Sequence, residues 1–253
     1  MNFLTTLQLF YTRKIKEALR NPAFVMMTLS IPLLYLLLFA PLLKNFTGMS
    51  EFGNTNVLNF FMPGMIMVLA VFGGLFVGFG MIDEIRQGVI ERFRVTPTSR
   101  LALLFGAVLR DITSVLAQAI IIIAAAIPFG LKVNIGGLLL IFLLAAMLTA
   151  IFASFSYALG LIFKSEDALA PITQGISMPI TLLAGFLLPM SLAPGWLQTA
   201  AHFNPVYYAI EAARTLMSDH IDTLVVLRAF AVLTPLLAIV SWWAVRKFKT
   251  VIS

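Results

Sequence analysis

Six long apolar runs leave this chain few ways to fold. A helix of about 20 mostly apolar residues crosses the hydrocarbon core of a bilayer. Hydrophobic residues make up 60% of the 253 residues and charged residues 11%, whereas soluble domains average about 25% charged residues. The sequence therefore predicts an all-α integral membrane protein, with one transmembrane domain over residues 1–253. The six predicted transmembrane helices are residues 22–43, 59–82, 110–130, 136–163, 168–190 and 224–245.

The third predicted span begins with two charged residues. Arg110 and Asp111 are costly at mid-bilayer, so we expect residues 112–130 to lie in lipid and residues 101–111 to form an interfacial lead-in. No acidic residue is expected deep in any span. Carriers driven by protons or sodium ions normally use an intramembrane carboxylate, so the sequence argues against that class of transporter.

Lysine and arginine residues predict the orientation in the membrane. Six spans place both termini on one side, and cytoplasmic segments are enriched in basic residues. We therefore expect both termini and segment 83–100 in the cytoplasm. The basic residues cluster at the ends of apolar runs and form no stripe, so no nucleic-acid partner is expected. The expected cytoplasmic residues are Arg13, Lys14, Lys16, Arg20, Arg86, Arg92, Arg94, Arg100, Arg110, Lys164, Arg246, Lys247 and Lys249; Lys44, Lys132, Arg214 and Arg228 fall on the other side.

Residues 1–21 precede the first span and have helical periodicity. Leu4, Leu7, Tyr11 and Ile15 share one face of a helix over residues 3–20, and charged residues cover much of the rest. This pattern predicts an amphipathic helix on the cytoplasmic leaflet. The alternative is a basic flank that only sets the topology.

Segment 83–100 is a charged island between two apolar runs. Ile85, Val89 and Phe93 are spaced four apart, which predicts a helix from Asp83 to Arg94. Pro97 cannot continue that helix. A rigid charged helix between two spans is suited to docking on a partner in water. The alternative is a merely solvated loop, although helix connections usually have only about 2–8 residues.

Residues 191–223 are too polar to span the membrane and too apolar for an ordinary loop. Asn204 is a good helix cap and Pro205 suits a first helical turn, so a helix is expected from Val206 to Met217. We predict a helical hairpin that re-enters the outer leaflet. The pair Glu211 and Arg214 is a candidate gate or substrate contact; the alternative is that the two charges simply neutralise each other near lipid.

The residues offer no catalytic or metal chemistry. The chain has no cysteine and two histidines, and it lacks a phosphate-binding G-x-x-x-x-G-K-[ST] loop. It also lacks a nucleophile–base pair inside the spans. Gly74 and Gly78 form a GxxxG step that permits close helix approach. Pro171 and Pro179 predict a bent fifth span.

Three features together resemble the permeases of type-2 ABC exporters, especially the daunorubicin-resistance-like drug-efflux branch. One is the amphipathic N-terminal helix before six spans. Another is Glu84-x-x-x-Gly88-x-x-Glu91-Arg92 running to Thr96-Pro97 and Arg100. The last is Leu188-Pro189 followed by Asn204-Pro205-x-x-Tyr208-x-x-Glu211-x-x-Arg214. The resemblance covers nearly the whole chain.

The resemblance implies a transport machine whose motor is a separate ATP-binding subunit, expected in two copies, which would bind ATP and Mg. This chain would carry no cofactor and no metal. Two permease copies, expected to be a homodimer in a bacterial inner (cytoplasmic) membrane, would enclose the path. Segment 83–97 would be the coupling helix, and the docking residues would be Glu84, Arg86, Gly88, Glu91, Arg92, Arg94 and Pro97.

The same resemblance assigns roles to the outer hairpin and to the second and fifth spans. The hairpin residues at the outer exit would be Asn204, Pro205, Tyr208, Glu211 and Arg214. The expected path-lining residues are Phe72, Phe76, Phe79, Gln174, Ser177, Met178 and Thr181. The leading function is export of a hydrophobic or amphipathic compound, such as a drug or a lipid-like molecule. The alternatives are a permease for a glycan or lipid-linked polymer, a non-transporting membrane anchor, and a channel subunit.

Overall fold

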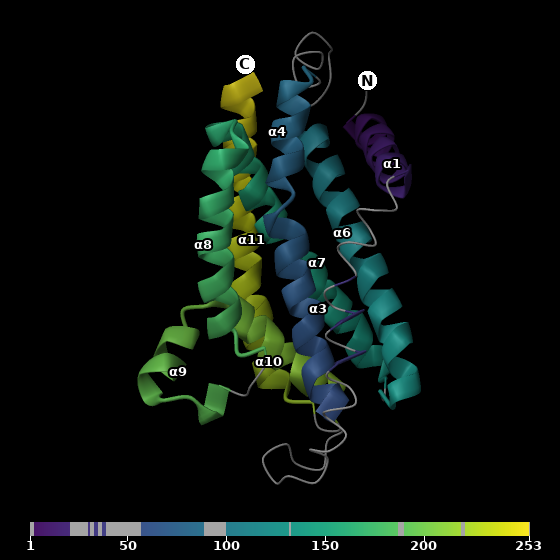
Figure 1. Ribbon diagram of the computed structural model, residues 1–253, viewed down its shortest axis with the longest axis vertical. Helices are drawn as coiled ribbons and strands as arrows, with labels where there is room; N and C mark the ends of the chain where they lie inside the picture. Colours follow the sequence, from purple (N-terminus) through teal and green to yellow (C-terminus); the bar gives the residue numbers. More distant parts are fainter. Residues whose placement is uncertain are drawn as a thin grey trace.

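The computed structural model describes residues 3–20, 30, 33–34, 37–38, 57–88, 100–131, 133–186, 190–218 and 221–252. The regular secondary structure in these residues is helical (Figure 1). Four stretches are long and apolar enough to cross a membrane: Leu58–Arg86, Leu101–Phe129, Ile135–Phe163 and Thr223–Phe248. They correspond to the second, third, fourth and sixth predicted spans. The first predicted span, 22–43, lies almost wholly outside the described residues.

The second span is two helices joined by a break. Helix α3 runs Val57–Leu75 and α4 runs Gly78–Arg86. The hydroxyl of Ser156, from the neighbouring helix, donates to the Leu75 carbonyl and accepts from the Gly78 N–H. Backbone polar groups freed inside a membrane protein need such partners, so Ser156 supports the break.

Helix α7, Ile135–Phe163, packs against α3, α4, α6, α8, α10 and α11, and has buried residues along its length. A Cβ added at Gly74 would lie 2.8 Å from the Thr149 carbonyl oxygen, and one added at Gly78 would lie 2.5 Å from the Ser156 carbonyl oxygen. Only glycine leaves room for the backbones to approach this closely. The predicted role of the GxxxG step is therefore confirmed.

Helix α6 differs from the third predicted span. It is continuous over Arg100–Ala126 and ends in the short 3-10 helix η2, Ile127–Phe129. Residues 101–111, predicted as an interfacial lead-in to the third span, form the first part of this helix, and Arg110 and Asp111 lie inside it.

Helix α8, Glu166–Leu183, is shorter than the predicted span 168–190. Gly185, in the left-handed region at φ 68°, follows its end, and residues 187–189 lie outside the described part of the chain. Glu166 and Asp167 occupy its first turn, where negative charge favours a helix N-terminus. Because of these acidic residues and the polar residues further along, α8 is less apolar than the four stretches that could cross a membrane.

The remaining helices define the two ends of the bundle. Helix α1 runs Phe3–Arg20, as the amphipathic pattern predicted, and it lies beside α6. Helix α11 runs Thr223–Ile252. The outer hairpin consists of η3, Met190–Leu192, α9, Gly195–Ala201, and α10, Pro205–Met217. Both termini lie at one end, and α9 and α10 lie at the other (Figure 1).

Candidate functional site

The last turn of α4 is the described part of the predicted docking segment. The helix ends at Arg86, and Gly88 adopts the left-handed region at φ 67°, with its N–H donating to the Ile85 carbonyl at 3.1 Å. The prediction of a single helix from Asp83 to Arg94 was therefore wrong. Glycine tolerates this conformation and commonly ends helices. The four-residue spacing of apolar residues runs through Gly88 in the sequence, so the spacing alone did not reveal the end of the helix. Glu91, Arg92, Arg94 and Pro97 fall in 89–99, beyond the residues that the structure describes.

Two ion pairs join this turn to other helices of the same chain. Lys14 on α1 pairs with Glu84, and Arg86 pairs with Glu166 at the start of α8. The Lys14 side chain is 12% exposed, and that of Glu84 is 22% exposed. Burial lowers the pKa of Lys14 below its usual value, against the opposing effect of Glu17. Glu84 and Arg86, expected to face a partner, thus also fix α1 and α8 to the end of α4.

Helix α1 is held against α6 by packing and by a hydrogen bond. A Cβ at Gly106 would lie 3.0 Å from the Cβ of Phe10, so the two helices approach closely there. The hydroxyls of Tyr11 and Thr113 are 3.0 Å apart. On the outer face of α1, Arg13 and Glu17 form an exposed pair at 2.9 Å. Nearby Lys14 and Arg13 lower the pKa of Glu17, although burial acts in the opposite direction.

A buried polar group lies next to this contact. The Asp111 carboxylate accepts a hydrogen bond from the Tyr157 hydroxyl at 2.6 Å and lies 2.9 Å from Arg110 Nη1. The Asp111 side chain is only 1% exposed. It therefore faces protein, at the level of α6 where Tyr11 meets Thr113. Sequence reasoning missed the roles of Lys14, Tyr157 and Glu166, since each depends on a partner on another helix.

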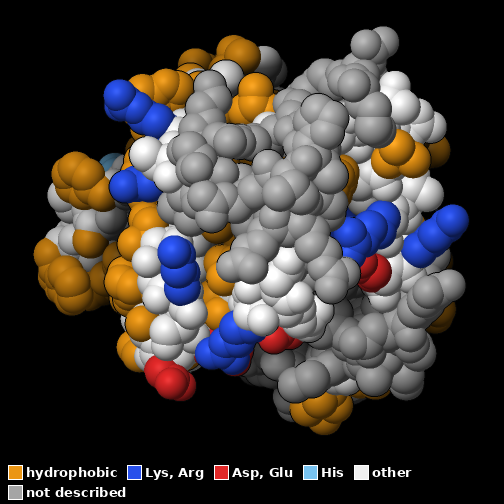
Figure 2. Space-filling model, turned by 90° about the horizontal axis from the view of Figure 1, so that it is seen from above, with side chains coloured by type: hydrophobic (Ala, Val, Ile, Leu, Met, Phe, Trp, Pro, Cys, Tyr) orange, Lys and Arg blue, Asp and Glu red, His pale blue; other side chains and the backbone are white. Residues whose placement is uncertain are grey.

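Figure 2 shows the end that carries the termini, where Lys and Arg side chains lie around the visible surface with fewer Asp and Glu. Arg13, Lys16, Arg86, Lys164 and Arg246 are exposed there. This surface also includes the last turn of α4. The exposed Lys and Arg side chains at this end can attract a partner that carries negative charge.

At the opposite end, Asn204 fixes the entry of α10. Its Oδ1 accepts from the Val206 N–H at 3.0 Å, and its Nδ2 donates to the Ile180 carbonyl on α8 at 2.7 Å. Pro205 takes the first helical position, as predicted. The Tyr208 hydroxyl donates to the His202 carbonyl at 3.0 Å. The cap is thus also a bond between α10 and α8.

Arg214 joins three helices. Its Nη1 donates to Glu211 at 2.9 Å, and its Nη2 donates to the carbonyls of Gly185 at 2.7 Å and Phe186 at 3.2 Å, beyond the end of α8. Its guanidinium lies 3.9 Å from the ring centroid of Phe60 on α3, and the side chain is 7% exposed. Neutralising Glu211 is therefore only one of its contacts. The planar guanidinium, with five donors, suits such a junction.

The predicted path residues divide into two groups. Phe72, Phe76 and Phe79 form a ladder on α3 and α4, with ring centroids 5.8 and 6.1 Å apart. Phe72 is 37% exposed and Met178 62% exposed, and Gln174 is exposed too.

Ser177 and Thr181 belong to the second group. Both are buried, and their hydroxyls donate to carbonyls of their own helix, at 3.0 and 2.6 Å. These two side chains therefore do not lie on an exposed face of the single chain. Helix periodicity alone did not separate them from Gln174 and Met178, because the fifth span had polar residues on more than one side.

The described residues hold no group of three or more His, Asp or Glu side chains that could bind a metal ion.

Comparison with known proteins identifies the family. The ABC-2 type transporter model matches residues 5–218. The chain belongs to the ABC-2 type transporter family. The daunorubicin resistance ABC transporter permease protein DrrB1 of Streptomyces coeruleorubidus is 27% identical over 192 residues, which cover 74% of this chain and 66% of that protein. The putative transport permease ycf38 of Cyanophora paradoxa is 26% identical over 218 residues, covering 85% of this chain and 75% of the relative.

Membership in the ABC-2 type family makes this chain a multi-pass membrane permease, and the resemblance to type-2 ABC permeases is confirmed. Both relatives are named as permeases, that is, as transport subunits. Permeases of this family partner with ATP-binding subunits. The family match includes α4, α8 and α10 and nearly all of α1, which are the helices that carry the two ion pairs and Arg214.

Proposed function

We propose that this ABC-2 type permease exports a hydrophobic or amphipathic compound, such as a drug or a lipid-like molecule, across the cytoplasmic membrane. Two copies form the path, and two ATP-binding subunits dock on segment 83–100 of the permeases. Both termini lie on the cytoplasmic side. The observation that carries the proposal is the junction at the last turn of α4, where Lys14–Glu84 and Arg86–Glu166 connect the dock to α1 and α8.

The junction gives a route for motion from the motor to the path. When ATP binding draws the motor subunits together, the docking segment moves with them and displaces the end of α4. The ion pairs pass this displacement to α1 and α8. The ladder of Phe72, Phe76 and Phe79 lies along α3 and α4, and only Phe72 in it is exposed. Gln174 and Met178 lie on α8, so α3, α4 and α8 move as the path changes from inward to outward facing.

The outer ends of the same helices are joined as well. Arg214 bonds the segment after α8 and contacts Phe60 on α3, and Asn204 bonds α8. Movement of α8 therefore reaches α10 directly. In this mechanism the outer hairpin opens and closes the exit, and Arg214 keeps α3, α8 and α10 together while it does so.

A glycan or lipid-linked polymer is the second candidate cargo, because aromatic rings such as the Phe72–Phe76–Phe79 ladder also stack on sugars. The exposed Met178 and Phe72 favour an apolar cargo.

The test is transport in proteoliposomes that contain the permease and its ATP-binding subunit. We expect ATP-dependent accumulation of a lipophilic cationic dye, lost when the ATP-binding subunit carries an inactivating substitution in its phosphate-binding loop. The permease variant Phe72→Ala tests the path itself, because it shortens the ladder and should weaken dye accumulation. Ion conductance without nucleotide would favour a channel instead, and ATP hydrolysis without movement of dye would favour the polymer permease or the anchor.

A further inference from the structure

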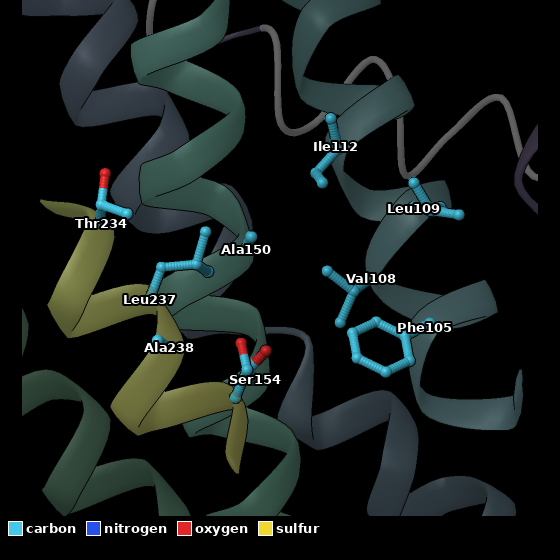
Figure 3. Close-up of a pocket in the computed structure, with 10 residues that line it drawn as sticks. Phe105, Val108, Leu109, Ile112, Ala150, Ser154, Thr234, Leu237 and Ala238 are labelled. Atoms are coloured by element: carbon cyan, nitrogen blue, oxygen red, sulfur yellow. The ribbon is translucent and has the colours of Figure 1, made fainter. Parts of the chain in front are cut away.

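A groove of about 370 Å³ runs between α6 and α11, away from the predicted path. Phe105 and Leu109 of α6 form one wall, and Thr234 and Ala238 of α11 form the other (Figure 3). Ser241 of α11 also lines the groove. Ala150 and Ser154 of α7 form the floor. These floor residues and Ala238 are small, and α6 and α11 are held apart above them. No residue of α3, α4 or α8 lines the groove, so it is separate from the proposed path.

The groove opens toward lipid. Its lining helices are three of those that are long and apolar enough to span the membrane. Phe105 is 37% exposed and Leu109 39% exposed, although both are large apolar side chains. In a bilayer such a surface is covered by hydrocarbon, and the apolar lining suits an acyl chain.

Basic and aromatic side chains lie at the end of the groove that is nearer the termini. Trp242, next to Ser241, is 61% exposed. Arg246, one turn further along α11, is exposed and lies 5.0 Å from the Trp242 ring centroid. Tryptophan favours the membrane interface, and an arginine there attracts anionic lipid headgroups. The apolar groove matches the acyl chain of a phospholipid, and the arginine at its interfacial end matches an anionic headgroup.

We infer that this groove binds one anionic phospholipid of the inner leaflet, with an acyl chain between α6 and α11 and the phosphate beside Arg246. The leaflet follows from the orientation under the proposed function, whereas the binding itself does not depend on transport. The lipid would brace α11 against α6 where few protein contacts join them. A second permease copy could cover this face instead, and the experiment below separates lipid binding from dimer formation.

Native mass spectrometry of the full chain in mild detergent tests the inference. The probes are phosphatidylglycerol and phosphatidylcholine with identical acyl chains. We expect the first phosphatidylglycerol to bind roughly fivefold more tightly than phosphatidylcholine, the preference that about one basic residue supplies near a headgroup. Ala238→Phe fills the groove and should abolish this first binding event. Its control is Ala231→Phe, at an exposed position of α11 outside the groove, which should bind as the wild type does.

A second pair of variants tests the headgroup contact. Arg246→Gln should bind the two lipids equally, whereas Arg228→Gln, exposed toward the other end of α11, should keep the preference. If Ala238→Phe does not fold, Ser241→Leu replaces it. Unchanged lipid binding in a folded groove-filling variant would overturn the inference, as would equal binding of both lipids by the wild type. Loss of a dimer with unchanged lipid binding would instead assign the groove to a second copy.

Discussion

Lys14 on α1 and Glu84 on α4 form an ion pair that fixes the N-terminal helix to the last turn before the predicted dock. Both side chains are largely enclosed, so the pair is less screened by water than an exposed pair. The pair thereby attaches α1 to the end of α4, just before the segment on which we propose that the ATP-binding subunit docks.

Exchange of the two charges should separate pairing from the identity of either residue. Lys14→Glu and Glu84→Lys should each lower the free energy of unfolding and uncouple ATP hydrolysis from transport, and the double variant should recover both. We expect a coupling energy of about 1–2 kcal/mol from the double-mutant cycle, measured by denaturation in detergent. The same exchange at Arg13 and Glu17, whose side chains are 47% and 46% exposed, should give only about 0.3–0.5 kcal/mol. A cycle that shows no coupling at Lys14 and Glu84 contradicts the role of the pair.

Removal of the Arg214 guanidinium should loosen the outer end of the bundle. Arg214→Ala leaves the Gly185 and Phe186 carbonyls without their donor, and we expect a loss of roughly 2–4 kcal/mol in unfolding free energy. Arg214→Lys should recover only part of this, because one ammonium group cannot reproduce the planar fork. Arg228→Ala, at an exposed site on α11, is the control and should change little. If Arg214→Ala were as stable as the wild type, the contacts of Arg214 would not stabilise the outer end of the bundle.

Two glycines test the packing directly. A Cβ at Gly137 would lie 2.1 Å from the Leu216 carbonyl oxygen, so Gly137→Ala must separate α7 from α10 and should cost about 1–3 kcal/mol. Gly80 has nothing within 4 Å of its added Cβ, so Gly80→Ala should be neutral or should stabilise α4 by about 0.5–1 kcal/mol. Thermal unfolding in the same detergent compares the two. A neutral Gly137→Ala would show that these helices are further apart.

The second ion pair of the junction is more exposed and should matter for coupling more than for stability. Arg86 and Glu166 have side chains that are 53% and 43% exposed. Arg86→Glu should therefore leave the unfolding temperature almost unchanged and reduce ATP-dependent transport, and Glu166→Arg in the same chain should restore it. Transport by Arg86→Glu at the wild-type level would exclude this pair from the route to α8.

Local signals predicted much of the fold. The apolar stripe of residues 3–20 and the Asn204-Pro205 cap both gave helices with the expected starts, because the information lies within a few residues of each helix. The end of α4 was not predictable from periodicity, since Gly88 adopts a left-handed conformation that interrupts a pattern continuing on either side of it.

Contacts between distant helices were beyond the reach of sequence patterns. The Glu211–Arg214 pair was predicted because its members are one turn apart, but the bonds of Arg214 to Gly185 and Phe186 depend on where α8 ends. Ser177 and Thr181 were predicted to line the path, and both are buried in the single chain. Their burial depends on neighbouring helices, which the sequence pattern does not show. The docking roles of Glu91, Arg92, Arg94 and Pro97 stay predictions.

Co-purification shows whether a separate ATP-binding subunit docks on segment 83–100. The tagged permease is isolated in mild detergent as wild type, as Glu91→Arg, and as Glu51→Arg, a charge reversal in the connection predicted on the outer side. We predict that the ATP-binding subunit accompanies the wild type and Glu51→Arg and is lost from Glu91→Arg, with all three proteins equally folded. Capture of the subunit by Glu91→Arg at the wild-type level would contradict the proposed dock, and a folded wild type that captures no ATP-binding subunit would contradict the account as a whole.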